Sequence, residues 1–292
     1  MKAAAISTSG PPNVLKVMEF DNPHAGAGQV RVRVKAAGIQ PFDLAVRYPQ
    51  ILGNEFAGII DQVGDKVTDF SIGNEVLGWA LLACYAEYVV VSVDQIVHKP
   101  QSMPWEEAGA ITASGQTAHT ALQELGVDKG DTILIHAAAG GVGTFAVQLA
   151  QAWGATVIGT ASERNHDYLR LLGAIPVTYG DGLADRVRAL APDGVDVAFD
   201  AGGDDALRAS LELVENKDRI GTIVAFDLVE ELGVRPIRSQ RSVDRLAQLV
   251  ELYSKGKLHI HIRKSFPLHQ AADAHREVES GHGRGKVVLT IG

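Results

Sequence analysis

The chain has 292 residues, of which 46% are hydrophobic and 31 are glycine, a length that favours two domains over one. Its formal net charge of -8 argues against nucleic acid or an anionic membrane surface as the main partner, because both require clustered lysine and arginine. The only cysteine, Cys84, excludes an intramolecular disulfide and a thiolate metal cage, and no apolar run approaches the roughly 18 residues of a membrane span, so we expect a cytoplasmic protein that binds small molecules.

Short strands dominate the first hundred residues. Residues 30–35 alternate apolar and charged side chains, which is typical of an antiparallel strand with one solvated face. Similar short runs at 58–63, 75–79 and 86–91 are each bracketed by Gly, Asp or Ser. We therefore predict a compact, barrel-like antiparallel domain in this part of the chain.

A helical pattern replaces the strands between residues 100 and 126. Its first turn contains Pro104 and two acidic residues, which is the chemistry expected at the positive end of a helix. From 132 to 226, strand and helix patterns alternate, which predicts a parallel sheet with crossover helices. The expected strands begin at Thr132, Thr156 and Ile175 and span 195–200 and 220–226.

The strongest functional signal is a glycine-rich turn after the predicted strand at Thr132. The sequence T-I-L-I-H-A-A-A-G-G-V-G runs into a helical segment, 144–154, and then into a second strand, 154–160. The glycines within 140–143 let the backbone approach a ligand closely, and the N-terminus of the following helix favours an anion such as pyrophosphate. Ala138 takes the first glycine position of G-x-G-x-x-G, which indicates a slightly different turn. The pattern predicts a dinucleotide-binding domain.

The tail contains a helix and a final strand. Apolar side chains follow helical spacing over 242–255, and residues 285–291 have the composition of a strand. We expect this last strand to return to the first domain.

Several short motifs lie in one order along nearly the whole chain. They are G-I-Q-P-F-D at 38–43, G-N-E-F-A-G at 53–58, A-E-Y at 86–88, T-A at 117–118, A-A-A-G-G-V-G at 137–143 with Q-L-A at 148–150, and G-K-V-V-L at 285–289. This set resembles the medium-chain dehydrogenase/reductase superfamily, in particular its zinc-free quinone oxidoreductase (zeta-crystallin-like) branch, in which the turn A-A-x-G-G-V-G is usual. The resemblance implies an α/β fold with a GroES-like, mostly antiparallel β catalytic domain (1–108), a Rossmann dinucleotide-binding domain (109–234) and a C-terminal segment (235–292) that returns to the catalytic domain.

The resemblance also bears on metal binding. Zinc-bearing relatives carry a cysteine and a histidine where this chain has Gln40–Pro41 and Asn54. A catalytic zinc requires about three protein ligands, so we expect none here.

The end of the second predicted strand favours NADPH over NADH. NAD enzymes carry an acid there for the ribose 2′-hydroxyl, whereas this chain has Ala161 and Ser162, followed by Arg164, which suits a bidentate phosphate contact. The resemblance adds Tyr179 as a further hydroxyl for the same phosphate. Glu163 would repel phosphate if it turned inward, and we interpret it as a solvated surface acid.

Roles for individual residues follow from the resemblance. Gln40 is expected to hold the carbonyl or quinone oxygen of the acceptor, at a position where the family usually has asparagine. Tyr48 is expected to be either a second donor to that oxygen or a packing residue. The expected cofactor-binding residues are Pro41, Phe42, Thr117, Ala138, Gly140, Gly141, Val142, Gly143, Thr160, Ser162, Arg164, Tyr179, Phe226, Leu228 and Lys286.

Structural roles are expected for other residues that carry reactive groups. Asp43 is predicted to accept hydrogen bonds from nearby backbone, Glu55 to be a buried structural carboxylate, and Cys84 to be a small buried hydrophobe. His259 and His261 share a face of a predicted strand, but without a third ligand we interpret them as surface histidines.

The combined pattern predicts an NADPH-dependent reductase that transfers hydride to a quinone or to an α,β-unsaturated carbonyl. The segment between Tyr48 and Leu52 is shorter than is usual in relatives, which would widen access for bulky or flat acceptors. Other reductions on the same scaffold, of enoyl thioesters or in aldehyde/alcohol chemistry, and NADPH binding without catalysis remain alternatives. The resemblance also implies a homodimer through sheet edges near 233–237.

Overall fold

Two compact units make up the computed structural model, which describes residues 1–8, 10–44, 50–281 and 283–292. The β unit contains residues 1–114 and 241–292, and the α/β unit contains residues 115–240. No helix in the described ranges is both long and apolar enough to cross a membrane.

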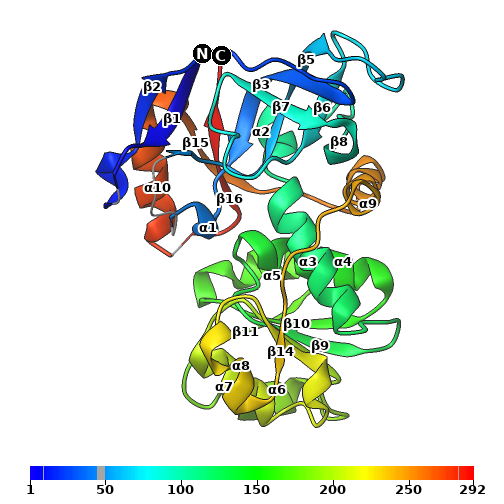
Figure 1. The fold of residues 1–292 in the computed structure, drawn as a ribbon. Coiled ribbons are helices and arrows are strands. Elements are labelled where there is room, and N and C mark those ends of the chain that lie inside the picture. The colour runs from blue at the N-terminus through cyan, green and yellow to red at the C-terminus, as the bar shows by residue number, and fades with distance from the viewer. Residues whose placement is uncertain (9, 45–49, 282) are drawn as a thin grey trace. The chain divides into compact units, whose positions relative to one another are not determined.

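Mostly antiparallel sheet builds the β unit (Figure 1). Its larger sheet has the order β15-β16-β3-β5-β6-β8, with β7 paired to β3, and a smaller sheet has the order β2-β1-β4. The strands are β1 (Lys2–Ile6), β2 (Lys16–Glu19), β3 (Gln29–Gly38), β4 (Gln50–Ile51), β5 (Phe56–Val63), β6 (Glu75–Gly78), β7 (Tyr88–Ser92), β8 (Ile96–His98), β15 (Ile262–Pro267) and β16 (Lys286–Thr290). The helices are α1 (Pro41–Leu44), α2 (Trp105–Ala108), α9 (Val243–Ser254) and α10 (Ala271–Glu279).

Strand β3 is the centre of the larger sheet. It is longer at both ends than the predicted strand and pairs with β5, β7 and β16. Val30, Val32 and Val34 are buried, which explains the alternation seen in the sequence. In β16, Val288 lies opposite Gly38, so the predicted return of the C-terminal strand to the first part of the chain is confirmed.

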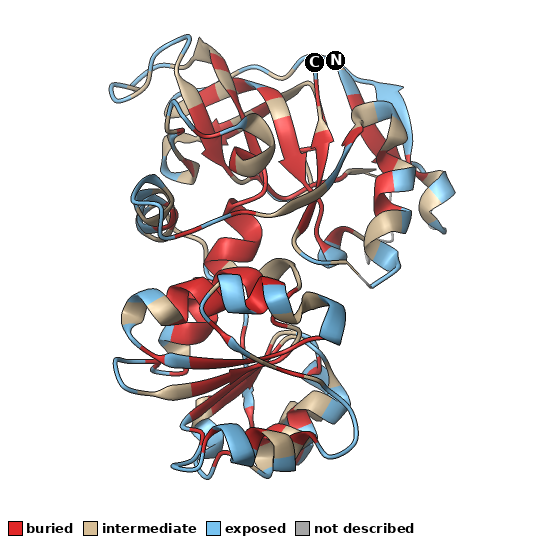
Figure 2. Ribbon diagram, turned by 180° about the vertical axis from the view of Figure 1, so that it is seen from behind, coloured by how far each residue is buried: buried red, intermediate tan, exposed pale blue. Residues whose placement is uncertain are grey.

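Six parallel strands form the α/β unit, in the order β11-β10-β9-β12-β13-β14. The strands are β9 (Thr132–Ile135), β10 (Thr156–Thr160), β11 (Ile175–Val177), β12 (Val197–Asp200), β13 (Ile220–Thr222) and β14 (Arg235–Pro236). The helices are α3 (Thr112–Glu124, which begins in the β unit), α4 (Gly141–Trp153), α5 (His166–Leu171), α6 (Leu183–Leu190), α7 (Asp204–Leu211) and α8 (Val229–Leu232). Helices α4 and α5 cover one face of the sheet, and α6 and α7 cover the other (Figure 1), while the strands between them are largely buried (Figure 2). The predicted alternation of strand and crossover helix is confirmed.

The predicted length of the last strand before the tail, β13, is wrong. It was expected over 220–226, but β13 ends at Thr222. The Thr222 hydroxyl oxygen accepts the N–H groups of Val224 at 3.1 Å and of Ala225 at 3.0 Å, which turns the chain out of the sheet. A short 3₁₀-helix, Phe226–Leu228, follows.

The helical pattern over 100–126 divides into α2 and α3. The break contains Gly109, which packs against strand β3 so closely that a Cβ there would lie 2.8 Å from the carbonyl carbon of Ala36. The chain therefore needs glycine at this contact, and the helix is interrupted there.

The order of the parallel strands reverses at β9. Strands β10 and β11 lie on one side of it, and β12, β13 and β14 lie on the other. Open α/β sheets bind ligands at the C-terminal ends of the strands beside such a switch point. The glycine turn follows directly after β9 and so lies at this position.

Candidate functional site

The glycine turn connects β9 to α4. Helix α4 begins at Gly141, with Gly140 as its N-cap, and no side chain caps it. Gly143 packs against the start of the turn, so that a Cβ there would lie 2.3 Å from the carbonyl oxygen of Ala137 and 2.7 Å from the Cα of Ala138. Only glycine fits at position 143, and the first N–H groups of α4 point toward a site suited to an anion.

Two residues of β10 fix the turn in place. The Thr160 hydroxyl oxygen accepts the N–H of Ala137 at 3.1 Å, and the Thr160 carbonyl accepts the N–H of Ala138 at 3.0 Å. A Cβ on Gly159 would lie 2.8 Å from the Cβ of Ala138. The Ala138 methyl therefore uses space that Gly159 leaves, which accounts for alanine at the first glycine position. The buried Thr160 hydroxyl therefore stabilises the turn through its hydrogen bond to the backbone of Ala137.

Ser162 and Tyr179 follow the ends of adjacent strands. Because β10 and β11 are parallel, with Thr160 opposite Val177, these two residues come at equal distances along the chain after the paired positions. Tyr179 is exposed, Ser162 is half-buried, and Arg164 is exposed shortly after it. Three residues predicted for the 2′-phosphate thus lie at the same edge of the sheet as the glycine turn.

The other cofactor candidates of the α/β unit are spread over separate elements. Val142 is in the first turn of α4, and Thr117 is half-buried on α3. Phe226 and Leu228 are in the 3₁₀-helix after β13, where the guanidinium of Arg238 lies 5.0 Å from the centre of the Phe226 ring.

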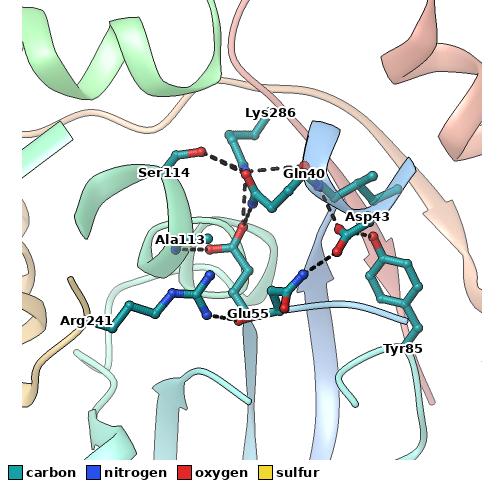
Figure 3. Close-up of polar contacts among 10 residues, drawn as sticks. Gln40, Asp43, Glu55, Tyr85, Ala113, Ser114, Arg241 and Lys286 are labelled. Atoms are coloured by element: carbon teal, nitrogen blue, oxygen red, sulfur yellow. Dashed lines mark hydrogen bonds and ion pairs between the residues drawn. The ribbon is translucent and has the colours of Figure 1, made fainter. Parts of the chain in front are cut away.

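A buried polar cluster surrounds Gln40 in the β unit (Figure 3). Gln40 Nε2 donates to Glu55 Oε1, and Gln40 Oε1 accepts from Ser114 Oγ at 3.2 Å. Lys286 Nζ donates to Ser114 Oγ at 3.0 Å and forms an ion pair with Glu55 Oε1, also at 3.0 Å. Glu55 Oε2 accepts the N–H of Ala113 at 2.7 Å in the first turn of α3. Glu55 is therefore the buried structural carboxylate that was predicted, and Lys286, a candidate for cofactor contact, is its partner.

Asp43 forms the other half of this cluster. Its Oδ2 accepts from the backbone N–H of Gln40 at 2.9 Å and from the Tyr85 hydroxyl at 2.7 Å, and its Oδ1 accepts from the Asn54 amide. The predicted role as a local backbone acceptor is confirmed. Burial raises the pKa of Asp43 to about 6, although these donors and Lys286 favour the carboxylate.

Tyr48 lies outside the described residues. Pro41 and Phe42 are exposed at the start of α1. His259 and His261 do not share a strand face, because β15 begins one residue after His261. Within the described ranges, no three side chains of His, Cys, Asp or Glu are grouped so that they could hold a metal ion.

Ser114, Asn54 and Tyr85 are members of the cluster for which no role was predicted. Ser114 is 74 residues from Gln40 in the sequence, so no spacing rule connects them. The available signal was weak, because Ser114 shares the stretch 108–118 with the polar residues Thr112, Gln116 and Thr117, and any polar residue of this stretch that is buried requires a hydrogen-bond partner. Such a residue needs a buried partner, but the sequence does not identify that partner.

Two buried histidines, His136 and His275, are expected to lower the stability of the protein in acid. Burial lowers the pKa of both His136 and His275 to about 4. His136 Nε2 lies 2.9 Å from Ser210 Oγ, and the His275 ring packs edge-on against the ring of Tyr85. Both pKa values are below the usual 6.5, so the stability that the two neutral histidines contribute to the folded state is present above pH 6.5 and is lost as the pH falls through about 4. Asp43 has the opposite sign, because a pKa raised from 3.8 to about 6 gives stabilisation that is lost as the pH rises through that range.

Acidification from about pH 7 to about pH 4 is expected to lower the thermal midpoint, because the two histidines, at roughly 3 kcal/mol each when fully titrated, outweigh Asp43 and Asp200, whose pKa values burial raises. His275→Phe keeps an aromatic ring beside Tyr85 and removes the titration, so the loss on acidification should shrink. Thermal melts followed by circular dichroism across this pH range measure it. His24→Phe, at an exposed histidine, is the control and should retain the wild-type loss. The same loss in His275→Phe as in wild type would show that other groups cause the acid sensitivity.

Comparisons with known proteins agree with this architecture. Residues 26–101 match the family model of the alcohol dehydrogenase GroES-like domain, and residues 172–289 match that of zinc-binding dehydrogenase. A quinone oxidoreductase from Pseudomonas aeruginosa is 32% identical, with 99% of each chain covered. A 2-haloacrylate reductase from a Burkholderia species is 31% identical, with 98% of each chain covered.

Solved structures of other proteins match this chain over the residues of both units. The structure of a quinone oxidoreductase from Coxiella burnetii is 34% identical, with a TM-score of 0.91 and with 100% of this chain and 99% of that chain covered. A mycobacterial protein solved in complex with NADPH is 26% identical, with a TM-score of 0.87 and with 99% of this chain and 100% of that chain covered.

Proposed function

The chain belongs to the medium-chain dehydrogenase/reductase superfamily, in its quinone oxidoreductase-like branch, and from this premise we propose that it is a zinc-independent, NADPH-dependent reductase of quinones or α,β-unsaturated carbonyls. The observation that carries the proposal is the turn at 140–143, which is close-packed at Gly143 and leads into a helix without a side-chain cap. Such a turn at the switch point of a parallel sheet fits a pyrophosphate. A relative named as a quinone oxidoreductase and a similar structure that contains NADPH support the choice of acceptor and cofactor.

The protein's contribution to the reaction is position and electrostatics. When bound, NADPH supplies the hydride. The N–H groups at the start of α4 would hold the pyrophosphate, and Thr160 keeps the turn in register with β10. Gln40 donates an N–H to the acceptor oxygen and stabilises the negative charge that develops there. An amide donor performs this role without a change in its own charge.

Ser162, Arg164 and Tyr179 are proposed to hold the 2′-phosphate that distinguishes NADPH from NADH. Arg164→Gln is expected to raise the KM for NADPH about 10- to 100-fold and to leave the KM for NADH within about twofold, because a hydrogen bond to a charged group contributes about 1.5–3 kcal/mol. Steady-state kinetics with both cofactors measure the two values.

Arg170→Gln is the matched control for this variant. Arg170 is an exposed arginine on α5 that pairs with Asp167 at 2.7 Å, and its loss should leave both KM values unchanged. If Arg164→Gln altered the KM for NADPH and NADH equally, Arg164 would not be a phosphate ligand.

Zinc independence is proposed from the residues that replace the ligands of zinc-bearing relatives. The Gln40 amide is bonded to Glu55, and the Asn54 amide is bonded to Asp43. Zinc in proteins is bound by thiolate, imidazole and carboxylate groups, and neither amide offers one.

The function is tested by following NADPH oxidation with a panel of quinones, enones, enoyl thioesters and aldehydes, with NADH for comparison. We expect turnover with quinones or enones, faster with NADPH, and unchanged after dialysis against a strong chelator. Turnover confined to thioesters or aldehydes would favour those reactions instead, and tight NADPH binding without any turnover would favour a binding role. A size series of acceptors tests the wider access proposed for the short segment between Tyr48 and Leu52, which a strict preference for the smallest acceptor would rule out.

A homodimer is proposed as the assembly. Strand β14 is the outer strand of the parallel sheet, and both Arg235 and Pro236 are exposed. An open strand edge offers backbone groups for pairing with a second copy.

A further inference from the structure

The hydrogen-bond directions around Gln40 follow from a single residue. The Lys286 ammonium group can only donate. Its three acceptors are Glu55 Oε1 and Ser114 Oγ, both at 3.0 Å, and the backbone oxygen of Ile39 at 3.4 Å. Ser114 Oγ therefore accepts from Lys286, and its one proton is free to reach Gln40 Oε1 at 3.2 Å.

The Gln40 amide consequently has one favourable orientation (Figure 3). Its oxygen accepts from Ser114, so its nitrogen faces the Glu55 carboxylate, which can only accept. The reversed amide would set its oxygen against the Glu55 carboxylate, lose the hydrogen bond to that charged group and leave the Ser114 proton without an acceptor. Glu55 cannot turn away easily, because the N–H of Ala113 holds its other oxygen at 2.7 Å.

One N–H of the amide remains after these bonds are made. Gln40 Nε2 carries two protons, and one of them goes to Glu55. The second has no partner among the residues that the structure describes. The cluster therefore leaves one N–H of the Gln40 amide able to donate to a ligand, while the amide oxygen already accepts from Ser114.

We propose that Lys286, acting through Ser114 and Glu55, sets the direction of the Gln40 amide so that an N–H donor faces the oxygen of the acceptor. This assignment rests on the proposed function, and it makes Lys286, Ser114 and Glu55 positioning residues. A fixed donor suits a quinone or enone oxygen that gains negative charge, whereas an amide carbonyl in the same place would repel it. It also gives a reason for a lysine that is 3% exposed at the start of a buried strand.

Ser114→Ala tests the relay, because it removes the hydroxyl and leaves the ion pair of Lys286 and Glu55 in place. We expect kcat/KM for the acceptor to fall about tenfold while the KM for NADPH stays unchanged, since one hydrogen bond to the amide is lost. Ser114→Thr restores the hydroxyl and should recover most of the activity. Ser254→Ala, at an exposed serine on α9, is the control and should behave as wild type.

A second readout uses the protein without cofactor or acceptor. With ¹⁵N-glutamine labelling, and with Gln40→Met to assign the signal, the two Nε2 protons of Gln40 should appear as a well-separated pair that exchanges slowly with water. In Ser114→Ala the separation should narrow and the exchange should quicken about tenfold.

The two readouts separate the possible failures. An unchanged amide pair in Ser114→Ala would overturn the positioning role. A changed amide pair with an unchanged kcat/KM would overturn the role of the amide toward the acceptor. A wild-type protein inactive with every acceptor would overturn the proposed function and with it the contact to an acceptor, and the amide spectra would still decide whether Ser114 orients Gln40.

Discussion

Replacement of Gly143 by alanine is expected to weaken NADPH binding about 100-fold, which corresponds to roughly 2.7 kcal/mol. The added Cβ would lie 2.3 Å from the carbonyl oxygen of Ala137 and 2.7 Å from the Cα of Ala138, and both are backbone atoms that no rotamer change can move aside. Helix α4 must therefore shift away from the turn, which displaces the N–H groups proposed to hold the pyrophosphate. Titration calorimetry with NADPH measures the loss, and overpacking of this kind should also lower stability by about 1–3 kcal/mol.

Gly140→Ala is the matched comparison, because it adds the same methyl group to the same turn. There the nearest atom to the new Cβ is the Ala137 carbonyl oxygen at 3.2 Å, so the backbone needs to yield by only a few tenths of an ångström. We expect a smaller loss of affinity and a thermal midpoint near that of wild type. Wild-type NADPH affinity in a folded Gly143→Ala protein would show that the turn does not bind the cofactor.

The parallel sheet could be predicted because the sequence signals for its strands and turns lie within short segments of the chain. Residues 133–135 are a continuous apolar run that ends in a glycine turn, and the structure buries all three in β9. Strand β13 was predicted too long because its end depends on the Thr222 hydroxyl, which captures two N–H groups after the strand. Strand β2, residues 16–19, was not predicted, because all of its residues are exposed at a sheet edge and carry no burial pattern.

The candidate site was predictable to very different degrees in the two units. In the α/β unit many of the proposed cofactor residues occur in two short segments, at 137–143 and 160–164, so the order of the chain brings these together, whereas Thr117, Tyr179, Phe226 and Leu228 lie on separate elements. In the β unit, Gln40 was singled out only through the family resemblance. Its partners Ser114 and Lys286 are brought to it by the pairing of β16 with β3 and by the first turn of α3, which are long-range contacts. A buried polar side chain requires a hydrogen-bond partner, but the tertiary fold determines which residue that partner is.

Lys286→Met should destabilise the protein by about 3–5 kcal/mol, because it leaves the carboxylate of Glu55 buried without its cation. Both side chains are almost fully buried, at 3% and 0% exposure, so water cannot replace the lost partner. Methionine keeps the unbranched shape of the lysine stem and removes only the ammonium group. Urea unfolding followed by tryptophan fluorescence measures the change, and Trp79 and Trp105 report on the β unit that contains the pair.

The double variant Lys286→Met with Glu55→Gln distinguishes a charge effect from a packing effect. If an unpaired charge causes the loss, neutralising Glu55 should recover much of it, even though a second residue has been changed. Lys255→Met is the control, because Lys255 forms an exposed ion pair with Glu251 on α9, and its urea midpoint should match that of wild type. A double variant less stable than Lys286→Met would mean that Glu55 stabilises the fold mainly through the Ala113 N–H and the Gln40 amide. The ion pair would then serve chiefly to set the direction of the amide, a role that the Ser114 variants test separately.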